Sequence, residues 1–284
     1  MRKGFWELAK TFASYREEMS SINQLFNETM VYCHDLGKKL TVKEYIDHTS
    51  FHRWAHNNGI TAISIDNLME KLKIDFFNSS GIRLELTQEE FLLYVETIYN
   101  LVNMKGKAER SIIDVISQIN HNIEIDCERL GFEVKRTGEE NFIIVEKNSA
   151  ATAVADKYAA EDSDFSFKVI EYNHFLLRGD IGRKRDILLA LGQKFESIHS
   201  QLKKGPFSGV ENDAGYLLNN LNIRHNNTSP DSPSYNAFVA QMSPKDLEAW
   251  YDKTYDILLL ALLADDFSAL HKEVEALKVQ MGVK

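Results

Sequence analysis

The placement of proline is the feature that most constrains how this chain folds. All four prolines lie in the last third of the chain, at positions 206, 230, 233 and 244. Proline lacks an amide N–H and clashes with the preceding helical turn, so it ends or kinks a helix. The first two-thirds of the chain therefore favours long helices, and apolar residues recur there at helical spacing. We expect helices over residues 11–35, 41–57, 65–75, 87–104 and 107–130.

Local signals mark where two of these helices begin and where the helical pattern stops. Thr41 and Thr87 are each followed three residues later by glutamate, the signature of a capping box. Strand-forming residues at 131–136 and 141–146 flank a turn with Gly138, which predicts a β-hairpin. A lone hairpin is only marginally stable, so we expect it to pack on the helices. A further short strand is expected within residues 79–86.

The length of 284 residues suits one large or two ordinary domains. A polar break at residues 161–164 is the best candidate boundary. We therefore predict a mainly α protein with a helical domain over 1–160, containing the hairpin near 131–147, and a helical bundle over 161–284. The bundle helices are expected at about 165–177, 181–203, 211–225 and 243–264, the last continuing or restarting over 267–279. Ser243, Pro244 and Asp246 form a strong helix start.

Net charge, cysteine spacing, apolar runs and missing motifs narrow the classes of function that this chain can have. The net charge of −9 means that any nucleic-acid site would be a local basic patch on an acidic body. Cys33 and Cys127 have no metal-like spacing, which favours a reduced, intracellular protein. The N-terminus lacks the apolar segment of a signal peptide, and the longest apolar run, 257–264, is too short to span a bilayer. We expect a cytoplasmic protein that does not contact a membrane. No Walker loop, dinucleotide fingerprint or nucleophile elbow is present in the sequence.

The most unusual stretch is residues 219–227, which holds an arginine, a histidine and five asparagines around two apolar residues. Such a stretch is a poor choice for a core and a weak helix former. Arg224 offers a rigid fork of donors and His225 can exchange a proton near neutral pH, which suits a phosphate site. Ordinary capping of a helix C-terminus also explains these residue types. Both interpretations stay open at this point.

Three segments resemble blocks of bacterial abortive-infection-like proteins with a HEPN-type helical domain. They are KVIEYNH at 168–174, LLNNLNIRHNN at 217–227 and LEAWYDKTYD at 247–256. The resemblance covers about residues 161–265. It implies a HEPN-like bundle of four to five helices that forms a homodimer. It also implies a metal-independent endoribonuclease in phage defence or a toxin system, a hydrolase that needs no cofactor.

The resemblance also implies roles for particular residues. Arg224 would bind the scissile phosphate of RNA, and His225 would assist proton transfer while the RNA 2′-hydroxyl attacks. The paired motifs of a dimer would form one cleft. The remaining side chains expected to contact substrate are Asn219, Asn220, Asn226, Asn227 and Tyr251.

The sequence departs from the family pattern where the histidine stands. In the family a few spacers separate the arginine from the histidine, whereas here His225 directly follows Arg224, and positions 228–230 hold Thr, Ser and Pro. The alternative is a catalytically silent HEPN-like module that binds RNA or protein. Its N-terminal domain would then sense a protein partner or a phage-derived trigger. Burial of Arg224 against Asp252 or Asp256 would indicate a structural role for the cluster.

Two further groups of residues raise weaker hypotheses. Arg178, Arg183, Lys184, Arg185, Lys203 and Lys204 could form a basic patch for RNA, or they could line solvated helix faces. His48, His52 and His56 lie four residues apart, a spacing at which a helix can present zinc ligands, although solvated or packed histidines are commoner.

Overall fold

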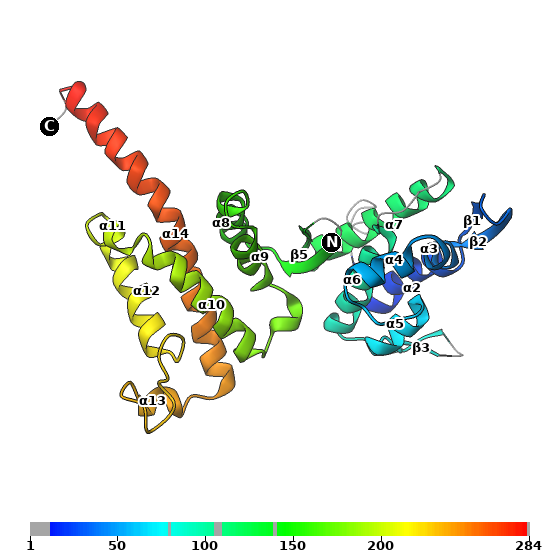
Figure 1. Cartoon of the computed structure of the whole chain (residues 1–284), viewed down its shortest axis with the longest axis horizontal. Helices are drawn as coiled ribbons and strands as arrows, with labels where there is room; N and C mark the ends of the chain where they lie inside the picture. The colour runs from blue at the N-terminus through cyan, green and yellow to red at the C-terminus, as the bar shows by residue number, and fades with distance from the viewer. Residues whose placement is uncertain (1–11, 79–80, 105–109, 139–140, 283–284) are drawn as a thin grey trace, which may run out of the picture. The chain divides into compact units, whose positions relative to one another are not determined.

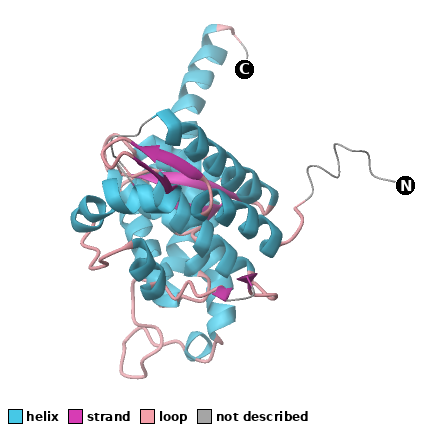
Figure 2. Cartoon of the chain, turned by 90° about the vertical axis from the view of Figure 1, so that its right-hand side faces the viewer, coloured by secondary structure: helices cyan, strands magenta, loops and turns pink. Residues whose placement is uncertain are grey.

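The computed structural model describes residues 12–78, 81–104, 110–138 and 141–282. The chain divides into two compact units, Met1–Lys147 and Asn148–Lys284. Both are mainly helical, as predicted, and the strands form short antiparallel pairs (Figures 1 and 2). The division lies earlier than the expected boundary at 160/161, because helix α8 (Ser149–Tyr158) packs on helices of the second unit. The polar break is instead the turn before the next helix, where Asp162 accepts a hydrogen bond from Phe165 N–H.

The first unit is built around three helices that pack on one another: α2, α6 and α7. Its elements in chain order are α2 (Tyr15–Asn27), β1 (Met30–Cys33), β2 (Lys38–Thr41), α3 (Val42–Ile46), the π-helical turn η1 (Asp47–Phe51), α4 (His52–Asn57), α5 (Ile65–Lys71), β3 (Phe77–Asn78), β4 (Gly81–Ile82), α6 (Gln88–Val102), α7 (Arg110–Arg129), β5 (Phe132–Thr137) and β6 (Asn141–Glu146).

Both predicted capping boxes are confirmed. The Thr41 side chain accepts from Glu44 N–H, while Glu44 accepts from Thr41 N–H at 2.9 Å. Thr87 and Glu90 repeat the arrangement at the start of α6. Each box satisfies backbone donors that the first helical turn leaves without partners.

The predicted β5–β6 hairpin is confirmed, and side chains of α6 complete its outer edge. Asn100 donates through Nδ2 to Phe142 O at 2.8 Å and accepts from Phe142 N–H at 2.9 Å. Glu96 accepts from Ile144 N–H at 2.6 Å. The free edge of this two-stranded sheet is thereby closed against a helix, which removes unpaired backbone groups. The strand expected within 79–86 is present only as β4, and residues 79–80 lie outside the described residues.

Two predicted helices are interrupted. The helix expected over 11–35 ends at Asn27, and β1 then pairs with β2 in the register Tyr32↔Lys39. The helix expected over 41–57 contains the π-helical turn η1, where the chain takes wider turns than an α-helix. The helix expected over 107–130 is seen from Arg110, because residues 105–109 lie outside the described part.

The second unit is a helical bundle around one long helix. Its elements are α8, α9 (Ser163–Glu171), the 3₁₀ turn η2 (Phe175–Leu177), α10 (Ile181–Glu196), α11 (His199–Lys203), α12 (Ser208–Asn220), α13 (Ala237–Ala240) and α14 (Pro244–Gln280). Helix α14 packs against α8, α10, α11 and α12, and it begins at Ser243 and Pro244 as predicted. The helix expected over 181–203 divides at Ser197, and the one expected over 211–225 ends at Asn220.

Candidate functional site at the end of helix α12

The asparagine-rich cluster is a loop that begins where α12 ends. Leu221 caps the helix, and Asn222 takes a left-handed backbone conformation with φ of 58°. Asparagine tolerates this region better than most residues other than glycine. Leu221 and Ile223 are buried in the core of the second unit and anchor the loop from below. The polar residues between and after them are therefore fixed relative to the core of the second unit.

Hydrogen bonds between two asparagines close this loop. Asn222 N–H donates to Asn227 Oδ1 at 2.7 Å, and Asn227 N–H donates to Asn222 Oδ1 at 3.1 Å. The Asn227 amide also donates to Ser234 O at 2.8 Å, and its side chain is buried. Asn227 was expected to contact substrate. Both polar atoms of its amide instead form hydrogen bonds within the loop.

Arg224 is directed at helix α10. Its Nη2 donates to Gly192 O at 3.0 Å and forms an ion pair with Glu196. Within the described residues it forms no hydrogen bond or ion pair with Asp252 or Asp256. A Cβ at position 192 would lie only 3.0 Å from Leu218 Cδ2, so glycine there permits the close packing of α10 on α12, whereas Arg224 Nη2 would lie at an ordinary contact distance of 3.5 Å. The Arg224 side chain is 19% exposed. Both contacts use Nη2, and Nε and Nη1 have no hydrogen-bond partner among the residues that the structure describes.

The other predicted contact residues lie around Arg224 at the surface. His225 and Asn226 are exposed, and Asn226 Oδ1 accepts from Ser229 N–H at 3.0 Å in a local turn. Asn219 is exposed on the last turn of α12, and Asn220 donates to Tyr216 O at 2.8 Å. The imidazole of His225 is thus the exposed titratable group next to the arginine.

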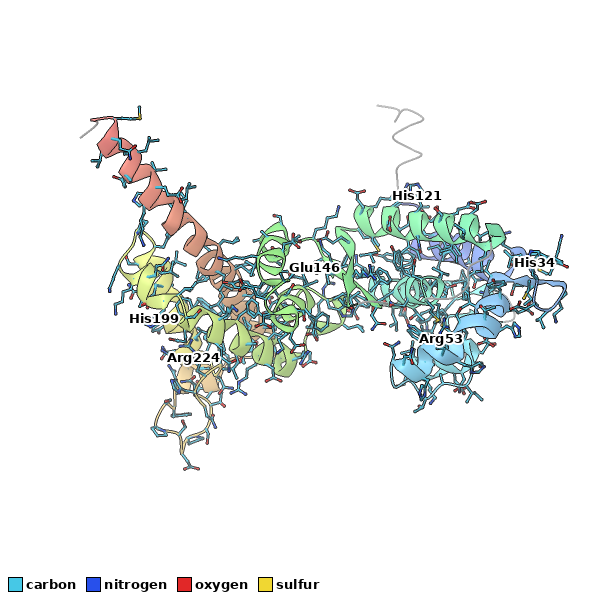
Figure 3. All side chains as sticks on the ribbon, turned by 45° about the horizontal axis from the view of Figure 1, so that its top comes forward. His34, Arg53, His121, Glu146, His199 and Arg224 are labelled. Carbon is cyan, nitrogen blue, oxygen red and sulfur yellow. The ribbon has the colours of Figure 1, made fainter. Side chains whose placement is uncertain are left out.

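Sequence reasoning missed two residues that the fold brings to this site. Glu196, which holds Arg224, lies 3.9 Å from His199 Nε2 through its other carboxylate oxygen (Figure 3). His199 Nδ1 lies 3.7 Å from Glu211 Oε1, and Glu211 Oε2 is buried with no hydrogen-bond partner in the described part of the chain. The Glu196 carboxylate therefore lies between Arg224 and a second histidine, His199. No sequence spacing links it to the cluster, because only the packing of α10 against α12 does so.

Tyr251 lies beneath the loop and not on its surface. It is fully buried in the core, and its hydroxyl has no hydrogen-bond partner within the described residues. Burial raises the pKa of this hydroxyl, while the charge of Arg185 acts in the opposite direction. Arg185 in turn donates through Nε to Asn222 O at the end of α12. In this conformation a substrate does not reach Tyr251.

The basic triplet at the start of α10 is used inside the chain. Arg183 makes a bidentate contact with Glu171, at 2.8 and 2.7 Å. Lys184 is buried between carboxylates of α14, and Arg185 holds the α12 end as described. Of the basic residues considered for a patch, Arg178 is exposed before α10, and Lys203 and Lys204 are exposed at the end of α11. The triplet thus connects α10 to α9, to α14 and to the end of α12.

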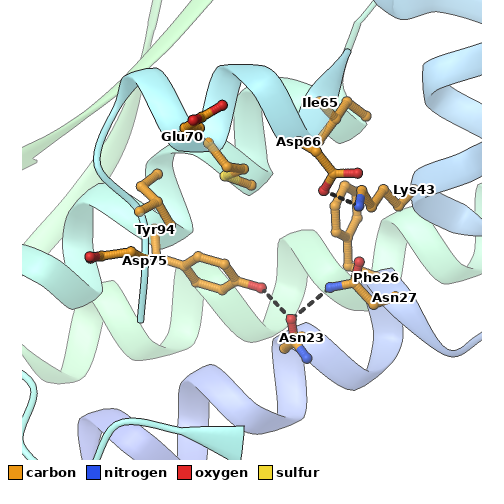
Figure 4. A pocket seen from close by; sticks show the side chains of 11 residues that line it. Asn23, Phe26, Asn27, Lys43, Ile65, Asp66, Glu70, Asp75 and Tyr94 are labelled. Carbon is orange, nitrogen blue, oxygen red and sulfur yellow. Dashed lines mark hydrogen bonds and ion pairs between the residues drawn. The ribbon is translucent and has the colours of Figure 1, made fainter. Parts of the chain in front are cut away.

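The first unit contains a polar hollow of about 500 Å³ (Figure 4). Tyr94 donates to Asn23 Oδ1 at 3.1 Å, Asn27 donates to the same oxygen at 2.6 Å, and Lys43 pairs with Asp66 at its rim. Its volume is within the range of small-molecule sites. The three histidines considered as zinc ligands are exposed, and no group of three metal-binding side chains occurs within the described parts of the chain.

Comparison with known proteins yields no match to a family model, to a curated protein or to a solved structure. Across the described residues, each helix is too short or too polar to cross a membrane. Structural support for a function therefore comes from the loop after α12.

Proposed function

We propose that the second unit is a HEPN-like module that cleaves RNA without a metal, in phage defence or as a toxin. The loop of residues 221–229 is its active site, and two copies contribute their loops to one cleft. The observation that carries the proposal is the exposed His225 next to Arg224, whose guanidinium is fixed by Gly192 and Glu196. A fixed cation beside an accessible imidazole suits a phosphodiester with a neighbouring hydroxyl.

The reaction proposed is attack of the RNA 2′-hydroxyl oxygen on the adjacent phosphorus. The 2′ oxygen loses its proton, the bond from phosphorus to the 5′ oxygen breaks, and the products are a 2′,3′-cyclic phosphate and a 5′-hydroxyl. Arg224 would direct its Nε and Nη1 donors at the non-bridging oxygens, where negative charge develops. His225 would transfer a proton. His199 supplies a second imidazole in the same group of charges, which suits the complementary acid or base role.

Glu196 sets the affinity of this site. It neutralises Arg224 in the free protein, so a phosphate must displace a carboxylate before it gains the guanidinium. Removing that charge should favour RNA. We expect Glu196→Gln to bind RNA more tightly than the wild-type chain by about 3- to 10-fold, since a competing partly exposed ion pair contributes about 1 kcal/mol.

Cleavage of a labelled single-stranded RNA by the full chain, with EDTA present, tests the proposal. Arg224→Ala and His225→Ala should each lower the rate by about 100-fold or more, and His199→Ala shows whether the second imidazole takes part. His52→Ala, an exposed histidine of the first unit, is the matched control and should leave the rate unchanged. Equal rates in all variants, or cleavage by none including wild type, would contradict the nuclease.

A catalytically silent RNA-binding module is the second candidate, and the Arg224–Glu196 ion pair favours it. The same RNA, labelled for fluorescence anisotropy, separates the two candidates. Binding without cleavage that weakens about 10-fold or more in Arg224→Ala supports the silent module. Binding that is the same in Arg224→Ala and wild type contradicts both candidates.

A further inference from the structure

The last turns of α14, and the residue that caps them, carry large apolar side chains that the described parts of the second unit leave exposed. Leu270, Val274, Leu277 and Met281 are between 41% and 69% exposed. Figure 1 shows this end of α14 extending beyond the other helices of its unit. Exposed apolar residues in such number on one helix mark an interaction surface.

These residues follow a seven-residue repeat. Phe267, Val274 and Met281 are spaced by seven, and Leu270 and Leu277 fall three residues after the first two, which gives the alternating spacing of a coiled-coil seam. At 100° per residue, the seam lies on a different face of the helix from the residues that α14 buries in the bundle. The bundle covers its beginning, because the Phe267 ring contacts Phe207 at 5.4 Å between centroids.

We propose that residues 267–281 of two copies of this chain form a parallel two-stranded coiled coil. Val274 at the central first core position, with Leu270 and Leu277 at the fourth positions, favours two parallel strands. Charge favours the same arrangement. In a parallel pair Glu273 faces Lys278 of the second copy, whereas an antiparallel pair places Lys278 beside His271 or another Lys278. This interface is separate from the loop after α12, and it does not depend on whether the chain cleaves RNA.

Cysteine crosslinking of the full chain tests both the interface and its direction. Met281→Cys places a thiol at a core position, so two copies in a parallel register should form a disulfide-linked dimer on mild oxidation. Val279→Cys, which lies on the outer face and is 78% exposed, is the matched control and should not crosslink efficiently. The natural cysteines Cys33 and Cys127 are buried. A dimer in solution without the Met281→Cys crosslink would assign association to another surface and overturn the proposal.

Sedimentation across about 1 to 100 µM measures the strength of the association, because a seam of about two heptads is small and we expect a micromolar dimer. Val274→Glu with Leu277→Glu should weaken dimerisation about 10-fold or more and abolish the Met281→Cys crosslink. Val279→Glu, an equal change of character outside the seam, should do neither. A wild-type chain that stays monomeric at the highest concentration, or a crosslink that survives the double change, overturns the coiled coil.

The charge pair gives a third measurement. Glu273→Lys alone and Lys278→Glu alone each place like charges across the parallel pair, so each should weaken self-association. Mixing the two variants should restore it, because every cross-chain pair then has opposite charges. Mixtures no tighter than the separate variants would contradict the parallel register.

Discussion

The two units bury polar side chains by different chemistry. In the second unit, Lys184 is only 6% exposed, and its ammonium lies 2.8 Å from Glu248 and 2.7 Å from Asp252. In the first unit, two half-buried amides pair with each other: Asn103 and Asn120 exchange hydrogen bonds of 2.9 and 3.0 Å. A buried charge needs opposite charges close by, whereas a buried amide needs only matching donors and acceptors. The stability of the two units should therefore respond differently to mutation and to pH.

The Lys184 network joins three helices. Tyr172, which caps the end of α9, donates to Asp252 Oδ1 at 3.0 Å, and its ring lies 5.2 Å from the Lys184 ammonium. The same ring stacks on Tyr255 of α14, with centroids 4.0 Å apart. Burial and the charge of Asp252 raise the pKa of the Tyr172 hydroxyl, so it stays a donor. Every partner in this network is satisfied by another, which makes the loss of any one costly.

Asp126 is the counterexample in the first unit. It is 3% exposed, and Arg129 Nη1 contacts it at 3.2 Å. Burial, together with the charge of Glu18, raises the pKa of this carboxyl to about 7, and Arg129 offsets only part of the rise. The acid is thus incompletely compensated, unlike the carboxylates around Lys184.

The largest expected effect is the loss of Lys184. Lys184→Met leaves Glu248, which is 20% exposed, and Asp252, which is 51% exposed, without their cation, so the second unit should lose about 3 kcal/mol of its free energy of unfolding, the lower end of the range for a broken buried pair. Hydrogen exchange measured by mass spectrometry resolves the units, and the first unit should be unaffected. Lys168→Met, which removes an exposed ion pair with Asp164, is the control and should cost less than about 1 kcal/mol. A similar small cost for Lys184→Met would end the contrast between the units.

A gain of stability is expected from Asp126→Asn at alkaline pH. The folded pKa of about 7 exceeds the usual unfolded value near 3.9, so the contribution of Asp126 is fully present below about pH 4 and is lost as pH rises through 7. Three pKa units correspond to about 4 kcal/mol, and the weaker contact with Arg129 returns about 1–2 of these. The variant should therefore gain about 2–3 kcal/mol at pH 8 and lose about 1–2 kcal/mol near pH 4, where Asp126 is protonated in the folded chain and only the weaker contact with Arg129 counts.

Unfolding of the first unit at several pH values measures this gain. Asp114→Asn, an exposed carboxylate on the same helix, is the control and should not change the pH profile. A wild-type first unit as stable at pH 8 as at pH 5 would show that Asp126 is compensated after all.

A smaller effect is expected for the paired amides. Asn103→Ala and Asn120→Ala should each cost the first unit about 1 kcal/mol, because each leaves one half-buried amide without its partner. The double variant should cost less than the sum, since the two losses are shared. A double-mutant cycle that finds simple additivity would show that the amide pair does not act as a unit.

The smallest effect should be equal in the two units. Thr87→Ala removes the cap of α6, and Ser243→Ala removes the cap of α14, whose hydroxyl accepts from Asp246 N–H at 3.1 Å. Each should cost about 1 kcal/mol in its own unit. Markedly unequal costs would mean that the units differ in how their helices begin as well as in how they bury polar groups.

Sequence patterns were informative where structure depends on neighbours along the chain. The capping boxes at Thr41 and Thr87, the β5–β6 hairpin and the start of α14 were all predicted. The β1–β2 hairpin was missed because Met30, Val31, Tyr32 and Cys33 are all apolar and hide the alternation between buried and exposed positions. The π-helical turn was missed because it widens the helix without changing its composition.

The residues of the candidate site also fall into those that the sequence predicted and those that only the structure brought together. A polar cluster at the end of a helix was predicted, and it follows α12 directly. Glu196 and His199 were not found, since they precede Arg224 by more than 20 residues and share no motif with it. The burial of Tyr251 and the pairing of Lys184 were also beyond the sequence, because both depend on which face α14 turns to its neighbours.

The sequence by itself determined the helix starts, the hairpin turn and the polar loop, because capping and turn hydrogen bonds join residues a few positions apart. Only the tertiary structure decided what each charge touches. Arg224 meets Gly192 across 32 residues, and Lys184 meets Asp252 across 68. Such pairs form when whole helices pack, and the free energy that packs them comes from apolar surfaces that do not specify a partner for any one charge.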